Sequence, residues 1–431
     1  MKTIAVATLG CKTNQYETEV ILNQFIESDF SLVDFSQSAD IYLINTCCVT
    51  NRAEYKSRNL VRKAIRNRKP NSKIIVTGCY VENNLDFFKK FDGELFTFSN
   101  IQKCQIFDCI ANKSESQKEK NLSKKFLELT TDKFNIHTRV PIKIQDGCDF
   151  FCSYCILPFI RGKPKSRKTE NIIKQVKKLA KNGVNEIVLT GINLGLYGKD
   201  FNNYSLLELV KDLSSQTDIK RIRLSSIEPN LFTDELIDEL SKNEKICPHF
   251  HIPLQSGSDK VLKKMNRCYS SRNFRETVEK IKEKIPNAAI GCDVIVGFPG
   301  ETDEEFEKTF SFIDNLDITY LHIFRYSPRP NTAAAKMKWK SNGVENKIRA
   351  KRLFSLNNEK KKRYFKYLID NEISIQVVLE KMENGFWTSV SDHYVKIFLK
   401  NKNVKKGELK KVIAEKIFFQ NEGISAKLIS E

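Results

Sequence analysis

Short apolar runs alternate with amphipathic stretches over the first 110 residues. Apolar residues at helical spacing predict helices over Glu17–Ser28 and Arg52–Lys69. Three continuous apolar runs predict buried strands at Thr3–Thr8, Asp40–Thr46 and Lys73–Thr77. Because alternating strands and helices favour a parallel sheet with right-handed crossovers, we expect an N-terminal α/β domain over residues 1–112.

A strand-then-helix unit recurs six times between residues 134 and 330. The predicted strands are Val140–Gln145, Glu186–Thr190, Arg221–Ser225, His249–Pro253, Ala289–Val296 and Tyr320–Tyr326. Helical patterns between them include Thr169–Lys181, Phe232–Ser241, Ser271–Lys284 and Thr302–Asn315. Six units are too few for a closed eight-stranded barrel, so we expect an open, partial (βα)6 barrel with its functional loops at the carboxyl ends of the strands. A charged stretch without Gly or Pro, Ala111–Lys133, predicts a linker ahead of it.

The last part of the chain, Ile373–Ile429, carries about five short alternating segments. They include Ser374–Leu379, Tyr394–Leu399 and Lys411–Phe418. This pattern predicts a small antiparallel β-barrel over residues 367–431. A basic connector at residues 336–366 joins the two barrels, and we group it with the central domain as residues 134–366. The expected fold class is therefore α/β with a separate C-terminal β-barrel.

Charge adds a candidate partner to this picture. The formal net charge is +19, and the connector alone holds twelve Lys or Arg against two Glu. Such a balance attracts polyanions, either nucleic acid or an anionic membrane surface. A Lys- and Asn-rich genome composition accounts for the total equally well, and a solvated helix face accounts for the connector. No stretch approaches ~18 consecutive apolar residues, so we expect neither a transmembrane helix nor a membrane partner.

Three of the twelve cysteines, Cys148, Cys152 and Cys155, follow the first strand of the central barrel with the spacing C-x3-C-x2-C. Three thiolates can hold three irons of a [4Fe–4S] cluster and leave the fourth iron open to a ligand. A structural zinc site would require a fourth Cys or His, and the nearest, His137, lies at the other end of the strand. Cysteines this sparse do not form a disulfide scaffold, so we expect metal ligation in a reducing cytoplasm.

A second group of cysteines is dispersed in sequence but equivalent in position. Cys11, Cys47 and Cys79 each follow a predicted strand of the N-terminal sheet by two or three residues. Neighbouring parallel strands end at one edge of a sheet, so the three thiols can converge on a second cluster. Any one of them alone is more simply a buried core residue. Of the remaining six, Cys48 beside Cys47 is a candidate spare thiol, and we expect the other five to be structural: Cys104, Cys109, Cys247, Cys268 and Cys292.

The C-x3-C-x2-C loop after the first strand of a partial barrel resembles the radical S-adenosylmethionine (SAM) enzymes. This resemblance implies that the open iron binds SAM, whose reductive cleavage gives a 5′-deoxyadenosyl radical that abstracts hydrogen. It also implies that Tyr154 lies near the adenine of SAM and that Gly191 and Asp293 line the site. A Gly after a strand is more often a simple turn residue.

With both cysteine triads and the small barrel, nearly the whole chain resembles the methylthiotransferase family. The motifs that carry the resemblance are Thr8–Glu19, Asn45–Cys47, Thr77–Tyr80, Gln145–Pro158, Arg161-Gly162, Ser166-Arg167, Arg223–Pro229, Ile252–Asp259 and Gly297–Thr302. Within the family, the stretches Asn14–Glu19, Phe151–Cys155 and Ser225–Pro229 look like the MtaB type. The C-terminal barrel resembles a TRAM RNA-binding domain, with a looser match at Gly385–Thr388.

This resemblance implies two [4Fe–4S] clusters and a tRNA substrate. The activity it implies is the addition of a methylthio group to carbon 2 of N6-threonylcarbamoyladenosine next to the anticodon. The Cys148, Cys152 and Cys155 cluster would cleave SAM, and the Cys11, Cys47 and Cys79 cluster would deliver sulfur. An electron donor and a sulfur source are required, and the sequence identifies neither.

Alternative interpretations remain at this point. The same chemistry could act on a prenylated adenosine in tRNA or on a ribosomal-protein aspartate. From other classes, the candidates are a non-catalytic RNA-binding protein with structural zinc and a two-cluster electron-transfer protein.

Overall fold

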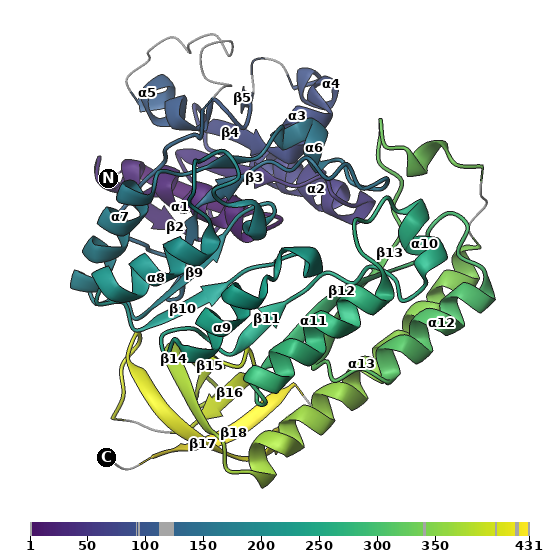
Figure 1. Ribbon diagram of the computed structural model, residues 1–431. Coiled ribbons are helices and arrows are strands. Elements are labelled where there is room, and N and C mark those ends of the chain that lie inside the picture. Colours follow the sequence, from purple (N-terminus) through teal and green to yellow (C-terminus); the bar gives the residue numbers. More distant parts are fainter. Residues whose placement is uncertain are drawn as a thin grey trace.

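Five parallel strands form the N-terminal sheet in the order β2-β1-β3-β4-β5 (Figure 1). The computed structural model describes residues 2–91, 93, 95–111, 125–338, 342–400, 403–418 and 422–429. The strands are β1 Lys2–Thr8, β2 Phe30–Val33, β3 Ile41–Thr46, β4 Lys73–Gly78 and β5 Leu95–Phe98, and the helices are α1 Lys12–Ile26, α2 Asn51–Asn67, α3 Cys79–Asn83, α4 Leu85–Lys89 and α5 Ile106–Ala111. The three strands predicted from the apolar runs are confirmed, and two edge strands of four residues, β2 and β5, are added to them.

Helix α1 begins at Lys12, five residues before the predicted start. Its first turns carry polar residues that are nonetheless buried, among them Thr13, Asn14 and Glu17. Because these buried positions are polar, apolar spacing does not predict the first turns of the helix. The reason is that α1 packs against its own sheet on one side and against the central barrel on the other, where Tyr16 and Val20 join the main core.

Six parallel strands form the predicted open barrel. They make two three-stranded sheets, β6-β9-β10 and β11-β12-β13, joined by a parallel bridge between Ile222 and Ile246. The strands are β6 Val140–Lys143, β9 Glu186–Thr190, β10 Arg221–Leu224, β11 His249–His251, β12 Ala289–Val296 and β13 Tyr320–Arg325. The outer helices are α7 Thr169–Lys181, α8 Leu206–Gln216, α9 Asp234–Lys242, α10 Asp259–Lys264, α11 Ser271–Lys284 and α12 Asp303–Asp314. Short elements follow β6: β7 Gln145–Asp146, α6 Leu157–Arg161 and β8 Lys165–Ser166.

The predicted linker is only partly within the described residues, since 112–124 lie outside them. The remainder, residues 125–133, packs against the barrel and is not a free spacer. Leu129 is buried in the main core and its carbonyl accepts a hydrogen bond from Tyr16, while Gln175 Nε2 donates to the carbonyl of Thr131 at 2.6 Å. The linker prediction was therefore wrong for this part, because a few apolar side chains among the charges anchor it.

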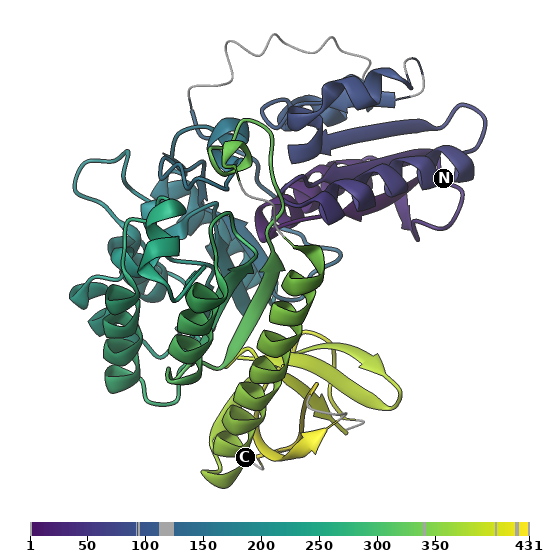
Figure 2. The ribbon, with the colours of Figure 1, turned by 90° about the vertical axis from the view of Figure 1, so that its right-hand side faces the viewer.

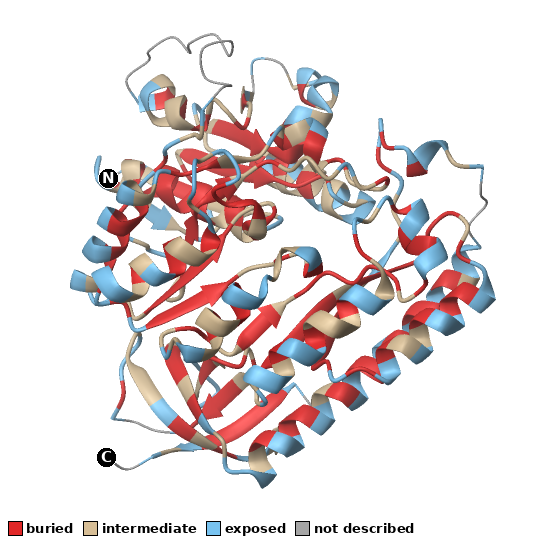
Figure 3. Cartoon of the chain, in the orientation of Figure 1, coloured by how far each residue is buried: buried red, intermediate tan, exposed pale blue. Residues whose placement is uncertain are grey.

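From Gly343 onward the basic connector is a long helix, α13 Gly343–Asp370, which crosses the outside of the barrel beside β12 and β13 (Figures 1 and 2). Residues 339–341 of the connector lie outside the described residues. One of its faces is buried and the other exposed (Figure 3). No helix in the described part of the chain combines the length and hydrophobicity needed to cross a bilayer.

The C-terminal strands close into a barrel in the order β14-β15-β16-β18-β17. They are β14 Ser374–Glu383, β15 Phe386–Ser391, β16 Lys396–Leu399, β17 Leu409–Phe418 and β18 Gly423–Leu428. Four pairings are antiparallel as expected, but β16 and β18 pair in parallel, so the barrel is mixed. After β16 the chain forms β17 beside β14, and it then returns as β18, which lies between β16 and β17. Because β18 is antiparallel to β17, it runs parallel to β16.

Candidate functional site

The first cysteine triad lies on the loop between β7 and α6. Its backbone is held by hydrogen bonds from the Cys148 amide to the Gly162 carbonyl at 3.0 Å and from the Cys155 amide to the Cys152 carbonyl at 2.9 Å. Gly147 has φ +76°, and a Cβ there would lie 2.1 Å from the Lys163 carbonyl oxygen. The turn therefore requires glycine at the residue before the first cysteine.

A buried arginine contacts this triad. Arg267 Nη1 lies 3.0 Å from Cys152 Sγ and 3.3 Å from the Tyr154 hydroxyl, and the same guanidinium pairs with Glu228. Burial raises the pKa of Cys155 to about 12, and the neighbouring Cys152 thiol adds to the shift. Such thiols stay neutral on their own and ionise when a metal supplies compensating positive charge. A guanidinium beside Cys152 stabilises that ionised form.

The second triad comes together at the carboxyl edge of the N-terminal sheet. Cys11 precedes α1, Cys47 follows β3, and Cys79 opens α3, after the adjacent strands β1, β3 and β4. Burial raises the pKa of Cys47 to about 12, and the nearby thiols of Cys79 and Cys11 raise it further. Gly78 has φ +100°, and a Cβ there would lie 2.4 Å from the Thr46 carbonyl oxygen, so this strand end requires glycine.

A buried charge network supports the second triad. Glu17 Oε1 accepts from Lys143 Nζ at 2.7 Å and from Arg161 Nη1 at 2.8 Å, and Lys103 pairs with the other carboxylate oxygen. Burial alone would raise the pKa of Glu17, but these cations, Arg161 first, hold it well below its usual value. Arg161 Nη2 also lies 3.7 Å from Cys79 Sγ. With Asp146 as the second carboxylate, three cations face two anions, which leaves one positive charge beside the thiols.

Each triad offers three thiols as its set of potential ligands. Around one tetrahedral zinc, with Zn–S about 2.3 Å, the sulfurs stand about 3.8 Å apart. Among the residues that the structure describes, His251, Asp293 and His322 form the one group of three potential ligand atoms within 4.8 Å of one another. Neither cysteine triad is that compact. Three thiols without a fourth protein ligand are the donor set of an open [4Fe–4S] cluster.

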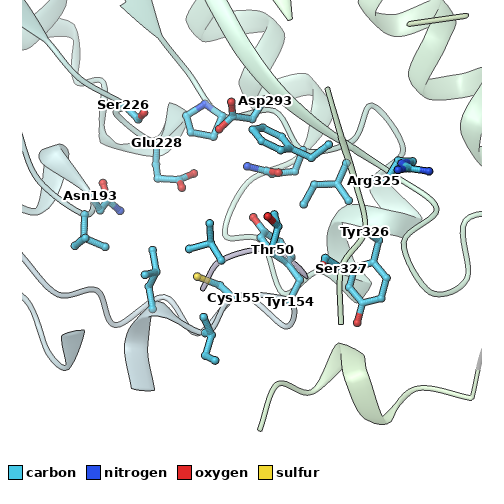
Figure 4. Close-up of a pocket in the computed structure, with 18 residues that line it drawn as sticks. Thr50, Tyr154, Cys155, Asn193, Ser226, Glu228, Asp293, Arg325, Tyr326 and Ser327 are labelled. Atoms are coloured by element: carbon cyan, nitrogen blue, oxygen red, sulfur yellow. The ribbon is translucent and has the colours of Figure 1, made fainter. Parts of the chain in front are cut away.

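A cavity of about 300 Å³ lies between the N-terminal sheet and the carboxyl ends of the barrel strands (Figure 4). Tyr154, Cys155 and Asp293 line it from the barrel, and Thr50 lines it from the start of α2. Arg329 holds the two sides together, because its guanidinium donates to the Cys48 carbonyl at 3.0 Å and pairs with Glu54 at 2.8 Å. The volume is at the lower end of the range for small-molecule sites.

The carboxylates of Glu228 and Asp293 point into this cavity, and Asn193 stands at its edge (Figure 4). Both amide atoms of Asn193 are buried without a partner in the described structure. Buried polar groups are normally paired, so this amide is suited to a ligand. The cavity therefore presents two carboxylates and a free amide to a polar ligand.

Gly191 does not line the first cavity. It lines an adjoining one of about 220 Å³ together with Cys11. A Cβ on Gly191 would lie 2.6 Å from Gln145 Oε1, which accepts hydrogen bonds from the amides of Ile192 and Asn193. The turn interpretation of this glycine therefore has a structural basis, and the turn positions Asn193.

Sequence reasoning did not assign roles to Arg161, Arg267, Glu228 or Asn193. Arg161 and Glu228 stand in motifs that were recognised, whereas Arg267 had no signal in the sequence. Each is brought to the site by contacts between residues that lie at least a dozen positions apart in the sequence, and spacing along the chain does not predict such contacts.

Comparison with known families gives two matches. Residues 142–313 match the Radical SAM superfamily, and residues 3–97 match an uncharacterized protein family, UPF0004. In fold, the radical S-adenosylmethionine methyltransferase TsrM from Kitasatospora setae, solved with cobalamin and a [4Fe–4S] cluster bound, is similar with a TM-score of 0.57. It is 13% identical, over 78% of this chain and 77% of that one.

Curated relatives match over most of the chain. The threonylcarbamoyladenosine tRNA methylthiotransferase MtaB of Bacillus subtilis is 38% identical, covering 100% of this chain and 98% of that protein. The MtaB of Thermotoga maritima is 36% identical over 92% and 91%. A tRNA-2-methylthio-N(6)-dimethylallyladenosine synthase of Natranaerobius thermophilus is 34% identical over 82% and 80%. The chain therefore belongs to the methylthiotransferase family of radical SAM enzymes, to its MtaB type.

Proposed function

We propose that this enzyme adds a methylthio group to carbon 2 of N6-threonylcarbamoyladenosine in tRNA. The names of its MtaB relatives support the nucleoside. The observation that carries the proposal is the placement of the two cysteine triads at adjoining cavities: Cys155 lines the first, Cys11 lines the second, and Ser226 lines both. A base held there would face both centres.

In this proposal Cys148, Cys152 and Cys155 hold the cluster that binds SAM, and Cys11, Cys47 and Cys79 hold a second one. When bound, the two clusters supply reductive SAM cleavage and a site for sulfur. Tyr154, Asp293, Glu228 and Asn193 orient SAM, and Gly191 shapes the turn that carries Asn193. Arg267 and Arg161 are positioning residues that stabilise the ionised thiols.

The tRNA backbone is bound in this proposal by exposed cations of α2 and α13. Helix α2 begins at the rim of the first cavity and exposes Arg52 and Lys56. Part of the α13 charge is structural, because Arg349 is buried against Glu301 and Lys360 donates to the carbonyl of Leu316. These two cations are buried in structural contacts and do not belong to a solvated helix face. The remaining exposed cations of the connector are available to phosphates.

We further propose that the C-terminal barrel contributes to RNA binding and that the enzyme works in the cytoplasm with a low-potential electron donor and a separate sulfur source. All twelve cysteines are free thiols, as a reducing compartment requires. The division into residues 1–112, 134–366 and 367–431 remains our proposal for the domains.

Nucleoside mass spectrometry of tRNA from a strain that lacks the protein tests the function. We expect loss of the 2-methylthio form of N6-threonylcarbamoyladenosine, while loss of a methylthiolated prenyl-adenosine instead would contradict the assignment. In vitro, Cys148→Ala should abolish SAM cleavage, and Cys79→Ala should keep cleavage but abolish methylthiolation. If the Cys79 variant still makes methylthiolated nucleoside, the assigned division of labour is wrong.

A further inference from the structure

The second cavity, which we call the lumen chamber, lies inside the partial barrel next to the proposed SAM cavity. It is built from all three parts of the chain: Cys11 and Lys12 come from the N-terminal domain, and Tyr394 comes from the C-terminal barrel. The barrel strands contribute the rest, including Ser225 and His249. The chamber is therefore complete only in the full-length fold.

Several polar groups of the lumen chamber have no partner. Lys12 is partly buried, and its ammonium makes no hydrogen bond or ion pair with any residue in the described part of the chain. Ser225 Oγ and His249 Nδ1 are buried and likewise lack partners there. Glu186 and Glu380 attract the Lys12 ammonium without pairing with it, and Arg139 and Arg223 repel it more strongly. An unpaired ammonium that faces a cavity beside a free hydroxyl and a free ring nitrogen indicates an anionic ligand with further hydrogen-bonding groups.

The other charged side chain of the chamber is already engaged. Arg223 Nε donates to Glu186 at 2.8 Å, and its remaining nitrogens donate to the carbonyls of Ser391 and Asp392. Its guanidinium also lies over the Tyr394 ring, 5.6 Å from the centroid. Arg223 therefore anchors the C-terminal barrel, and Lys12 is the cation left for a ligand.

The chamber also has an aromatic wall and a link to the SAM cavity. The rings of His249 and Tyr394 stack with centroids 4.4 Å apart, and Tyr320 stacks on Tyr394 at 5.6 Å. His251 bridges the two cavities, because it contacts Ser226 Oγ at 2.7 Å and Asp293 at 3.0 Å. A small polar group that enters from the SAM cavity would thus meet a flat wall, a free hydroxyl and a free ammonium.

We propose that the lumen chamber binds the threonylcarbamoyl group of the substrate nucleoside, with its carboxylate on Lys12 and its hydroxyl or urea group at Ser225. This inference rests on the proposed function. Carbon 2 and N6 lie on the same edge of adenine, so a base whose carbon 2 faces the two cysteine triads directs its N6 substituent into an adjoining space. A prenyl group carries no charge and would leave Lys12 unpaired, which gives the chamber a basis for selectivity.

The test measures binding rather than turnover. Fluorescence anisotropy without reductant gives the affinity of the holoenzyme for three anticodon stem-loops, whose adenosine is threonylcarbamoylated, prenylated or unmodified. We expect Lys12→Gln to weaken binding of the threonylcarbamoylated stem-loop by about tenfold or more, since a hydrogen bond to a charged group is lost. Binding of the other two should change by less than about twofold, because neither carries the carboxylate. Lys12→Arg should restore most of the preference.

Two further variants make the result decisive. Lys177→Gln, at an exposed lysine of α7, is the matched control and should leave all three affinities unchanged. Ser225→Ala removes a single hydroxyl oxygen at a position that is not next to a cysteine in the sequence. It should weaken binding of the threonylcarbamoylated stem-loop by about three- to tenfold. The inference is overturned if Lys12→Gln and Ser225→Ala both keep the wild-type preference. If the wild-type enzyme itself shows no preference for the threonylcarbamoyl group, the proposed function fails instead.

Discussion

Replacing Glu17 by Gln tests the buried charge network beside the second triad. Glu17 and Lys103 are both fully buried, and Lys143 and Arg161 are almost so. The isosteric amide leaves three cations facing only Asp146. Removing one partner from a buried ion pair typically costs about 3–5 kcal/mol, and we expect a loss in this range in the free energy of unfolding.

The loss should depend on pH in a defined direction. Because the pKa of Glu17 lies well below its usual value in the folded protein, its stabilising contribution is present above the ordinary carboxyl pKa and disappears as pH falls through the lowered one. Urea unfolding of wild type and variant, followed by circular dichroism at several pH values, should show the largest difference near neutrality and a smaller one in acid. Glu244→Gln, at an exposed site, is the matched control. A loss below about 1 kcal/mol at neutral pH would refute the reasoning.

Three other predictions concern the backbone, the tRNA surface and the first triad. Gly78→Ala should lower the free energy of unfolding by about 3 kcal/mol or more, because a positive φ and a steric clash combine at this residue. Gly183 also has a positive φ but open space around it, so Gly183→Ala should lower the free energy of unfolding by only about 1 kcal/mol. Thermal unfolding measures both. Changing Arg52 and Lys56 together to Gln should weaken tRNA binding and reduce the slope of log Kd against log salt concentration by about 1.5. The same change at a pair of exposed lysines on α7 should leave both quantities unchanged. Arg267→Met should raise the KM for SAM and lower iron retention by the first triad, measured on variants with the second triad removed.

Most of the fold was predictable because apolar periodicity determines it. Strands β9 and β12 and helices α7 and α11 have the predicted bounds, since each has a clear buried face and a clear end. Where the pattern of buried apolar residues is weak, apolar periodicity did not predict the structure. At the start of α1, Asn14 and Glu17 are buried and hydrogen-bonded polar residues. In residues 125–133, the few apolar side chains that anchor the segment, such as Leu129, are too widely separated to form a recognisable pattern.

The grouping of the cysteines into two triads was predictable from the sequence, and the charged residues around them were not. Cys11, Cys47 and Cys79 could be grouped because parallel strands end on one edge, a rule of topology. Arg267 contacts Cys152, and Lys12 lines the lumen chamber, only because distant elements assemble. Lys12 in particular faces the lumen chamber only because α1 packs against the barrel, and a lysine beside a cysteine in the sequence gives no indication of this.

The most direct test of two open clusters is the iron and sulfide content of anaerobically reconstituted protein. Wild type should hold about eight irons per chain, and the variant in which Cys11, Cys47 and Cys79 are all Ala should hold about four and still cleave SAM. Protein that contains only zinc, or iron content that is unchanged when the second triad is removed, would contradict the account.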